Sequence, residues 1–168
     1  MFPGDICING DAAHPLALAL AHMHQRSFHF HGVRYSNLQT FLQAITYPRA
    51  SDQAAVSGLP AKEIRRHLAA THHLEPPFSF LLFKNQWFRR HGTEYQALLQ
   101  QAYDELFAQD LEVRHQFLLC DPAETTITLR PHKLKRIPLR ASELLDQCTR
   151  LHRRARAEAS HGEPTGTS

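Results

Sequence analysis

Histidine is the residue with the most obvious chemical potential in this chain, which carries 13 histidines among its 168 residues. Two close pairs stand out, His22-x-His24 and His29-x-His31. In a strand the two members of each pair would face the same side. A zinc site needs three or four converging ligands, however, and neither a His-Glu-x-x-His motif nor paired cysteines accompany these histidines. We therefore expect scattered surface histidines and no bound metal.

The three cysteines, Cys7, Cys120 and Cys148, form no close-spaced pair. Their odd number implies no disulfide framework, so a reducing cytoplasm is the expected compartment. Cys148 falls on an apolar stripe, where a cysteine is usually a small hydrophobic residue and not a nucleophile. Seven glycines in the whole chain supply no glycine-rich phosphate loop, and we predict no cofactor.

Charge is distributed unevenly along the chain, although the formal net charge is only +3. Residues 1–129 hold 10 lysines and arginines against 12 aspartates and glutamates, whereas residues 130–168 hold 9 against 4. A basic C-terminal segment could contact a nucleic acid or an acidic partner. A solvated helix face followed by a disordered tail over residues 156–168 explains the same charges, and no aromatic platform is interleaved with them. We favour the second interpretation.

The clearest predicted element is a helix over residues 94–109. Its apolar side chains recur at helical intervals and form one continuous stripe: Tyr95, Leu98, Leu99, Ala102, Tyr103, Leu106 and Phe107. Thr93 and Gln96, at its start, have the spacing of a capping box. A stripe of this kind packs against a hydrophobic core, so we expect a core helix.

The other elements are shorter and do not follow a regular βαβ order. A strand over residues 28–33 ends in a His31-Gly32 turn, and the helix that follows is stopped by Pro48. Further helices are expected over residues 52–57, from Pro60, over 113–119 and over 142–157. A strand is expected over residues 125–129. Residues 78–83 form either a strand or a buried irregular loop. No apolar run reaches the roughly 18 residues of a membrane span. The sequence predicts one predominantly helical α+β domain over residues 1–155.

Residues 28–47, FHFHGVRYSNLQTFLQAITY, carry the most informative motif. It joins a short strand and a glycine turn to a helix that ends in a Gln-Ala pair. Its members, in order, are Gly32, Val33, Tyr35, Ser36, Asn37, Gln39, Phe41, Leu42, Gln43 and Ala44. Together with the helical pattern of residues 90–119, this order resembles the NADAR family, which includes the bacterial N-glycosidase of riboflavin-pathway intermediates. The resemblance runs through most of residues 8–155.

The resemblance implies a domain with a pocket for an N-ribosyl phosphate compound or an ADP-ribosylated group. Family members cleave the bond between a ribose carbon and a nitrogen, and a carboxylate stabilises the oxocarbenium charge or activates water. The position of the family glutamate is Gln39 in this chain, and the position of a family lysine is Thr46. The candidate pocket residues that the resemblance implies are His22, Tyr35, Gln39, Gln43, Thr46 and Trp87.

Two functional hypotheses remain open at this point. The first, which we favour, is a degenerate site in a module that binds a ribosyl-phosphate or ADP-ribose-type ligand or a protein partner. The second is a diverged, active N-glycosidase that recruits His22, Glu94 or Asp104 in place of the missing carboxylate. Gln39 also has a purely structural explanation, because glutamine serves as well as glutamate at the third position of a capping box begun by Ser36. Metal-dependent hydrolysis through the histidines has the least support.

Overall fold

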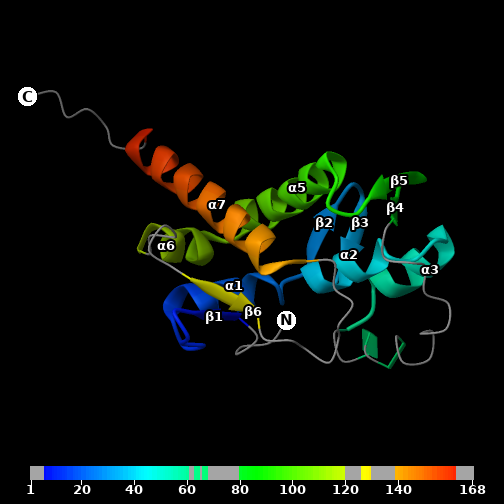
Figure 1. The fold of residues 1–168 in the computed structure, drawn as a ribbon, viewed down its shortest axis with the longest axis horizontal. Helices are drawn as coiled ribbons and strands as arrows, with labels where there is room; N and C mark the ends of the chain where they lie inside the picture. The colour runs from blue at the N-terminus through cyan, green and yellow to red at the C-terminus, as the bar shows by residue number, and fades with distance from the viewer. Residues whose placement is uncertain are drawn as a thin grey trace, which may run out of the picture.

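The computed structural model describes residues 6–60, 63–64, 66–67, 80–119, 126–129 and 139–161, which form a predominantly helical α+β domain (Figure 1). The predicted fold class is confirmed. The elements in chain order are β1 (Ile6–Ile8), α1 (Pro15–Met23), β2 (Phe28–Phe30), β3 (Val33–Tyr35), α2 (Leu38–Ala44), α3 (Ala50–Ser57), β4 (Phe80–Phe83), β5 (Gln86–Arg89), α5 (Thr93–Gln109), α6 (Leu111–Leu119), β6 (Ile127–Leu129) and α7 (Ala141–His161).

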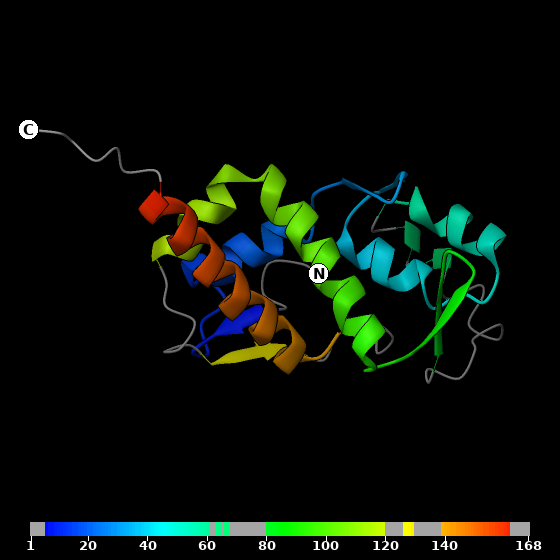
Figure 2. The ribbon, with the colours of Figure 1, turned by 90° about the horizontal axis from the view of Figure 1, so that it is seen from above.

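Helix α5 runs between two groups of elements and contacts both (Figure 2). At one end of the molecule it packs against α6 and α7, which lie beside α1, β1 and β6. At the other end it contacts β2 and β5, next to α2 and α3. All seven residues of its predicted apolar stripe are buried, as the helical periodicity requires. The prediction of a core helix is confirmed.

The start of α5 differs from the expected capping box. Gly92 is the N-cap residue and no side chain caps the helix, so Thr93 already lies in the first turn. The Gln96 side chain donates instead to the Glu143 carboxylate on α7, with an N–O distance of 2.9 Å. A tertiary acceptor thus replaces the local cap, and the predicted Thr93–Gln96 capping pair is wrong.

Two β-hairpins flank α2, and the tight turn of each hairpin has two central residues with positive φ. The β2–β3 turn has φ of 50° at His31 and 80° at Gly32, whereas the β4–β5 turn has 48° at Lys84 and 62° at Asn85. Positive φ at both central residues is the geometry of a type I′ turn, which matches the right-handed twist of the strands. The first turn lies where the His-Gly pair predicted it. The second has no glycine, which explains why β5 was not expected.

The hairpins are held to α2 by a cluster of aromatic rings centred on Phe41. The Phe41 ring centroid lies 5.1 Å from that of Phe30, 5.2 Å from Tyr35, 5.9 Å from Phe83 and 6.2 Å from Phe28. All four contacts are edge-to-face, an arrangement that adds electrostatic attraction to the burial of apolar area. This cluster fixes the position of α2 and therefore of Gln39 and Gln43.

Strands β1 and β6 pair although they are far apart in the chain. Ile6 lies opposite Leu129 and Ile8 opposite Ile127 in an antiparallel register, and Asn9 Oδ1 extends the pairing by accepting from the Thr126 amide at 2.9 Å. The strand over 125–129 was expected and is observed from Ile127 onward. Strand β1 was not expected, because three residues give too short a pattern for the sequence to reveal.

Helix α7 extends further than predicted and continues through His161. The beginning of the expected C-terminal tail is therefore helical, whereas residues 162–168 lie outside the described part. Leu144, Cys148, Leu151 and Ala155 form its buried stripe. Within the described ranges, no helix combines the length and the apolar character that a bilayer crossing requires.

Candidate functional site

Four of the six candidate pocket residues lie together around α2. Tyr35 ends β3, Gln39 and Gln43 belong to α2, and Thr46 follows one turn later. All four are buried, with exposed fractions of 5%, 5%, 4% and 8% in that order. The strand, turn and helix of the motif therefore bring these side chains to one region of the fold.

The start of α2 removes the structural explanation for Gln39. The N-cap residue is Asn37, whose Oδ1 accepts from the Thr40 amide at 2.8 Å and from the Thr40 hydroxyl at 3.0 Å. The predicted cap at Ser36 is wrong by one residue, because asparagine competes successfully for this position. Gln39 is consequently the second residue of the helix and not the third, so a capping box does not require its side chain.

The buried polar groups of this region are neutral. The Thr46 hydroxyl donates to the backbone carbonyl of Gln43 at 2.7 Å and accepts from the Gln43 side-chain Nε2 at 3.1 Å. Burial raises the pKa of Tyr35 to about 12, which keeps the phenol protonated. Residues 28–47 contain no aspartate or glutamate. The segment can form hydrogen bonds, but it supplies no carboxylate to a reacting centre.

The remaining two candidate residues lie elsewhere. His22 is on α1, half exposed, and its Nε2 accepts from Arg26 Nε at 2.9 Å. The same Arg26 forms an ion pair with the buried Asp110 at 3.0 Å, so His22 belongs to the junction of α1 and α6. Trp87 is on β5, and 56% of its surface is exposed. His22 and Trp87 therefore do not belong to the buried group around α2.

A groove of about 390 Å³ lies between the β2–β3 turn and α5. It is lined by Phe30, His31, Gln101, Asp104 and Glu105. His31 Nδ1 accepts from Lys84 Nζ at 3.2 Å, and Nε2–H therefore donates to Gln101 Oε1 at 3.3 Å, which is the arrangement of a neutral imidazole. The groove combines an imidazole with two carboxylates, and no local pattern predicts it because its members come from distant segments.

A second polar arrangement that sequence reasoning missed joins α5 to α7. The Glu143 carboxylate is buried and accepts from His91 Nδ1 at 2.9 Å, from Gln96 at 2.9 Å and from the Arg140 amide at 2.7 Å. His91 Nε2 in turn accepts from Arg90 Nε at 2.9 Å. Both ring nitrogens of His91 form hydrogen bonds, so this histidine links Arg90 to Glu143 and is not available as a base. Its only sequence signal is a glutamate in the first turn of a predicted helix.

Cysteine and metal chemistry find no support in the described part of the chain. Burial raises the pKa of the Cys148 thiol to about 12, which keeps it protonated and unreactive. Cys7 is also buried, in β1, and Cys120 lies outside the described residues. Among the residues that the structure describes, no group of three histidine, cysteine, aspartate or glutamate side chains could hold a metal ion.

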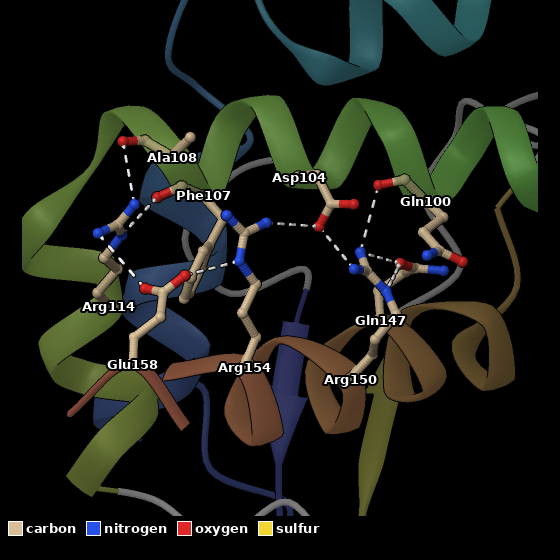
Figure 3. A network of polar contacts seen from close by, with 9 residues as sticks. All are labelled: Gln100, Asp104, Phe107, Ala108, Arg114, Gln147, Arg150, Arg154 and Glu158. Atoms are coloured by element: carbon tan, nitrogen blue, oxygen red, sulfur yellow. Dashed lines mark hydrogen bonds and ion pairs between the residues drawn. The ribbon is translucent and has the colours of Figure 1, made fainter. Parts of the chain in front are cut away.

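The arginines of α7 are engaged in a network with α5 and α6 (Figure 3). Asp104 Oδ1 accepts from Arg150 at 2.6 Å and from Arg154 at 3.2 Å. Arg154 also pairs with Glu158 at 2.8 Å, and Glu158 lies 3.6 Å from Arg114 of α6. The charges of Arg150 and Arg154 are therefore neutralised within the fold, whereas Arg153 and Arg156 are exposed.

We expect Asp104→Ala to lower the free energy of unfolding by about 1 kcal/mol at low ionic strength, because two partly exposed ion pairs are lost. The loss should shrink in high salt, since these side chains are 28–39% exposed and screening reaches them. Urea unfolding at low and high salt measures both values. Asp146→Ala, at an exposed site on α7, is the matched control and should have little effect. A salt-independent loss would contradict an electrostatic role.

No family model, no curated protein and no solved structure matches this chain.

Proposed function

We propose that this chain is a divergent NADAR-like protein whose N-glycosidase site has lost its catalytic carboxylate, and that it acts as a ligand-binding or protein-interaction module. The observation that carries this proposal is Gln39, which lies on α2 at the position that the resemblance assigns to the family glutamate. It is buried, and no aspartate or glutamate is present from residue 28 to residue 47. Its ligand would be a ribosyl-phosphate or ADP-ribose-type compound.

The chemistry of the reaction explains why this substitution matters. Cleavage of a ribose–nitrogen bond develops positive charge at the sugar, and a carboxylate stabilises that charge or activates water. The amide of Gln39 keeps the shape of a glutamate but carries no charge and takes no proton. Thr46, at the position of the family lysine, is a neutral hydroxyl already bonded to Gln43. A pocket with these groups can hold a ligand through hydrogen bonds without cleaving it.

The compartment that fits this proposal is the cytoplasm. Cys148 is a free thiol buried in the apolar stripe of α7. Reduced thiols are the ordinary state of cysteines in a reducing compartment.

We expect the purified protein to release no base from N-ribosyl phosphates or ADP-ribosylated compounds above background. Loss of a key carboxylate commonly costs a factor on the order of 10³ or more in rate. Product release is measured by chromatography for the unmodified protein, Gln39→Glu and Gln39→Ala. Gln147→Glu, which places an acid at an equally buried glutamine of α7, is the matched control.

Two outcomes of this experiment bear on the proposal in opposite directions. Activity that appears in Gln39→Glu and not in Gln147→Glu would show that the pocket is intact and lacks only its carboxylate. Robust turnover by the unmodified protein that survives Gln39→Ala would contradict the proposal.

The alternative is an active N-glycosidase that uses substitute residues, and one observation favours Asp104 among the candidates. Asp104 lines the groove beside His31, and both of its arginine bonds go to Oδ1, which leaves Oδ2 outside that pairing. His22 is bound to Arg26, and Glu94 is exposed at the start of α5. If this alternative holds, Asp104→Asn should abolish turnover that Gln39→Ala leaves intact.

A further inference from the structure

The outer face of the β4–β5 hairpin exposes two large aromatic side chains. Residues directly opposite each other in an antiparallel pair project to the same side, as do alternate residues along a strand. The pairs Phe80–Arg89 and Leu82–Trp87 therefore share one face of the hairpin. Leu81 and Phe83 on the other face are buried in the core, and Leu82, opposite Trp87 on the outer face, is buried as well. On the outer face Trp87 is 56% exposed and Phe80 is 49% exposed.

The two exposed rings are spaced as neighbours on a sheet surface. Phe80 and Trp87 are diagonal partners in the register, which places them about 7–8 Å apart. Arg89 lies opposite Phe80 and two residues beyond Trp87 on the same strand. The face thus presents two flat apolar rings with a guanidinium beside both.

The charge of this segment is uniformly positive. Residues 80–93 contain Lys84, Arg89 and Arg90 and no aspartate or glutamate. The Arg89 side chain is exposed and has no ion-pair partner within the described part of the chain. This differs from α7, where Arg150 and Arg154 are neutralised by carboxylates (Figure 3). Among the described residues, Arg89 therefore offers an unpaired positive charge on the hairpin, which lies at the opposite end of the molecule from the end of α7 (Figure 2).

We propose that the outer face of the β4–β5 hairpin binds single-stranded nucleic acid, with bases stacked on Phe80 and Trp87 and a phosphate held by Arg89. Aromatic side chains on a sheet face stack unpaired bases, and basic residues beside them follow the backbone. Stacking needs exposed rings, and Trp87 and Phe80 are 56% and 49% exposed. An acidic protein segment would match the charge, but anchors of protein interfaces usually fill packed pockets. This binding face is separate from the Gln39 region and does not depend on the function proposed for it.

The chain provides its own probe for this proposal, because Trp87 is its only tryptophan. Titration of the full-length protein with a single-stranded oligothymidylate of about ten nucleotides, within the usual site size, should quench the Trp87 fluorescence. The affinity should fall as salt is raised, because the phosphate contact at Arg89 releases counterions. No change in Trp87 emission at low salt would overturn the proposal.

Variants then separate stacking from general attraction to a basic protein. Trp87→Leu should weaken binding of a labelled oligothymidylate, followed by anisotropy, about tenfold, whereas Trp87→Phe should retain most of the affinity. Arg89→Gln should reduce the slope of log affinity against log salt by about 0.7. Arg156→Gln, at an exposed arginine of α7, is the matched control and should change neither value. Circular dichroism of each variant confirms that the fold is retained.

Three results would contradict this assignment. Equal affinity of Trp87→Leu and the unmodified protein would exclude stacking at the hairpin. Duplex DNA bound as tightly as the single strand would indicate attraction to phosphate alone. Displacement of the oligonucleotide by polyglutamate at equal concentration would assign the face to an acidic protein partner instead.

Discussion

Replacing Phe41 with alanine should lower the free energy of unfolding by about 3–5 kcal/mol, the cost typical of deleting a buried aromatic ring. Phe41 has no exposed surface and makes edge-to-face contacts with four other rings. Its removal would leave a cavity between α2 and both hairpins, and the surrounding rings could collapse into it only in part. Because small domains have only about 5–15 kcal/mol of stability, this loss is a large fraction of the total.

Urea unfolding followed by circular dichroism measures this effect. Phe41→Leu keeps part of the volume and should cost less than the alanine variant, so it provides a value if Phe41→Ala does not fold. Phe80→Ala is the matched control, because that ring is half exposed and its loss should change stability by no more than about 0.5 kcal/mol. Equal losses for Phe41→Ala and Phe80→Ala would contradict the central position of Phe41.

Acid should destabilise the fold through His24, a histidine buried between α1 and α5. Its Nδ1–H donates to the Leu20 carbonyl at 2.8 Å, and its Nε2 accepts from the Tyr103 hydroxyl at 2.8 Å. Burial lowers the pKa of His24 from 6.5 to about 3. The imidazole is therefore neutral in the folded protein, and protonation would place a charge in the core and break the bond from Tyr103.

The direction of the pH dependence follows from these values. Between pH 6.5 and about 3 the unfolded chain holds a proton on His24 that the folded chain does not. Stability contributed by neutral His24 is therefore complete above pH 6.5 and is lost as the pH falls. The loss approaches about 1.4 kcal/mol per pH unit and reaches about 2 kcal/mol near pH 5.

Other groups also titrate in this range, so the measurement is a comparison of slopes. Urea unfolding between neutral pH and about pH 5 should show a weaker pH dependence for His24→Gln than for the unmodified protein. His115→Gln, at an exposed histidine of α6, is the matched control and should leave the slope unchanged. Identical slopes for His24→Gln and the unmodified protein would contradict the role of His24.

The elements that sequence reasoning predicted correctly are those whose residues carry the signal themselves. The stripe of α5 repeats over four turns, and each of its members is buried as expected. The predicted caps were wrong where another residue, nearby or distant in the chain, formed the competing hydrogen bond. Asn37 caps α2 in place of Ser36, and Gln96 bonds to Glu143 in place of the helix start. Local patterns do not include such competitors, because a distant acceptor is not visible in the spacing.

Tertiary structure decided which of the residues that are distant in the chain meet, and which side chains face outward. The motif of residues 28–47 placed Tyr35, Gln39, Gln43 and Thr46 together because they are close in sequence. Trp87 faces outward because the register of β4 and β5 sets its side, and a slip of one residue would have turned it toward the core. Asp104 and His31 share a groove although they are far apart in the chain.

The sequence by itself determined the helical α+β character, the core stripe of α5 and the absence of a carboxylate from residues 28–47. These follow from the order of residue types, which no folding event changes. Only the tertiary structure decided four other features. These are the pairing of β1 with β6, the ion pairs of Arg150 and Arg154, the burial of His24 and the exposure of Trp87. Each depends on the partner that lies across from the residue, and the energies of burial, pairing and hydrogen bonding are set by that partner.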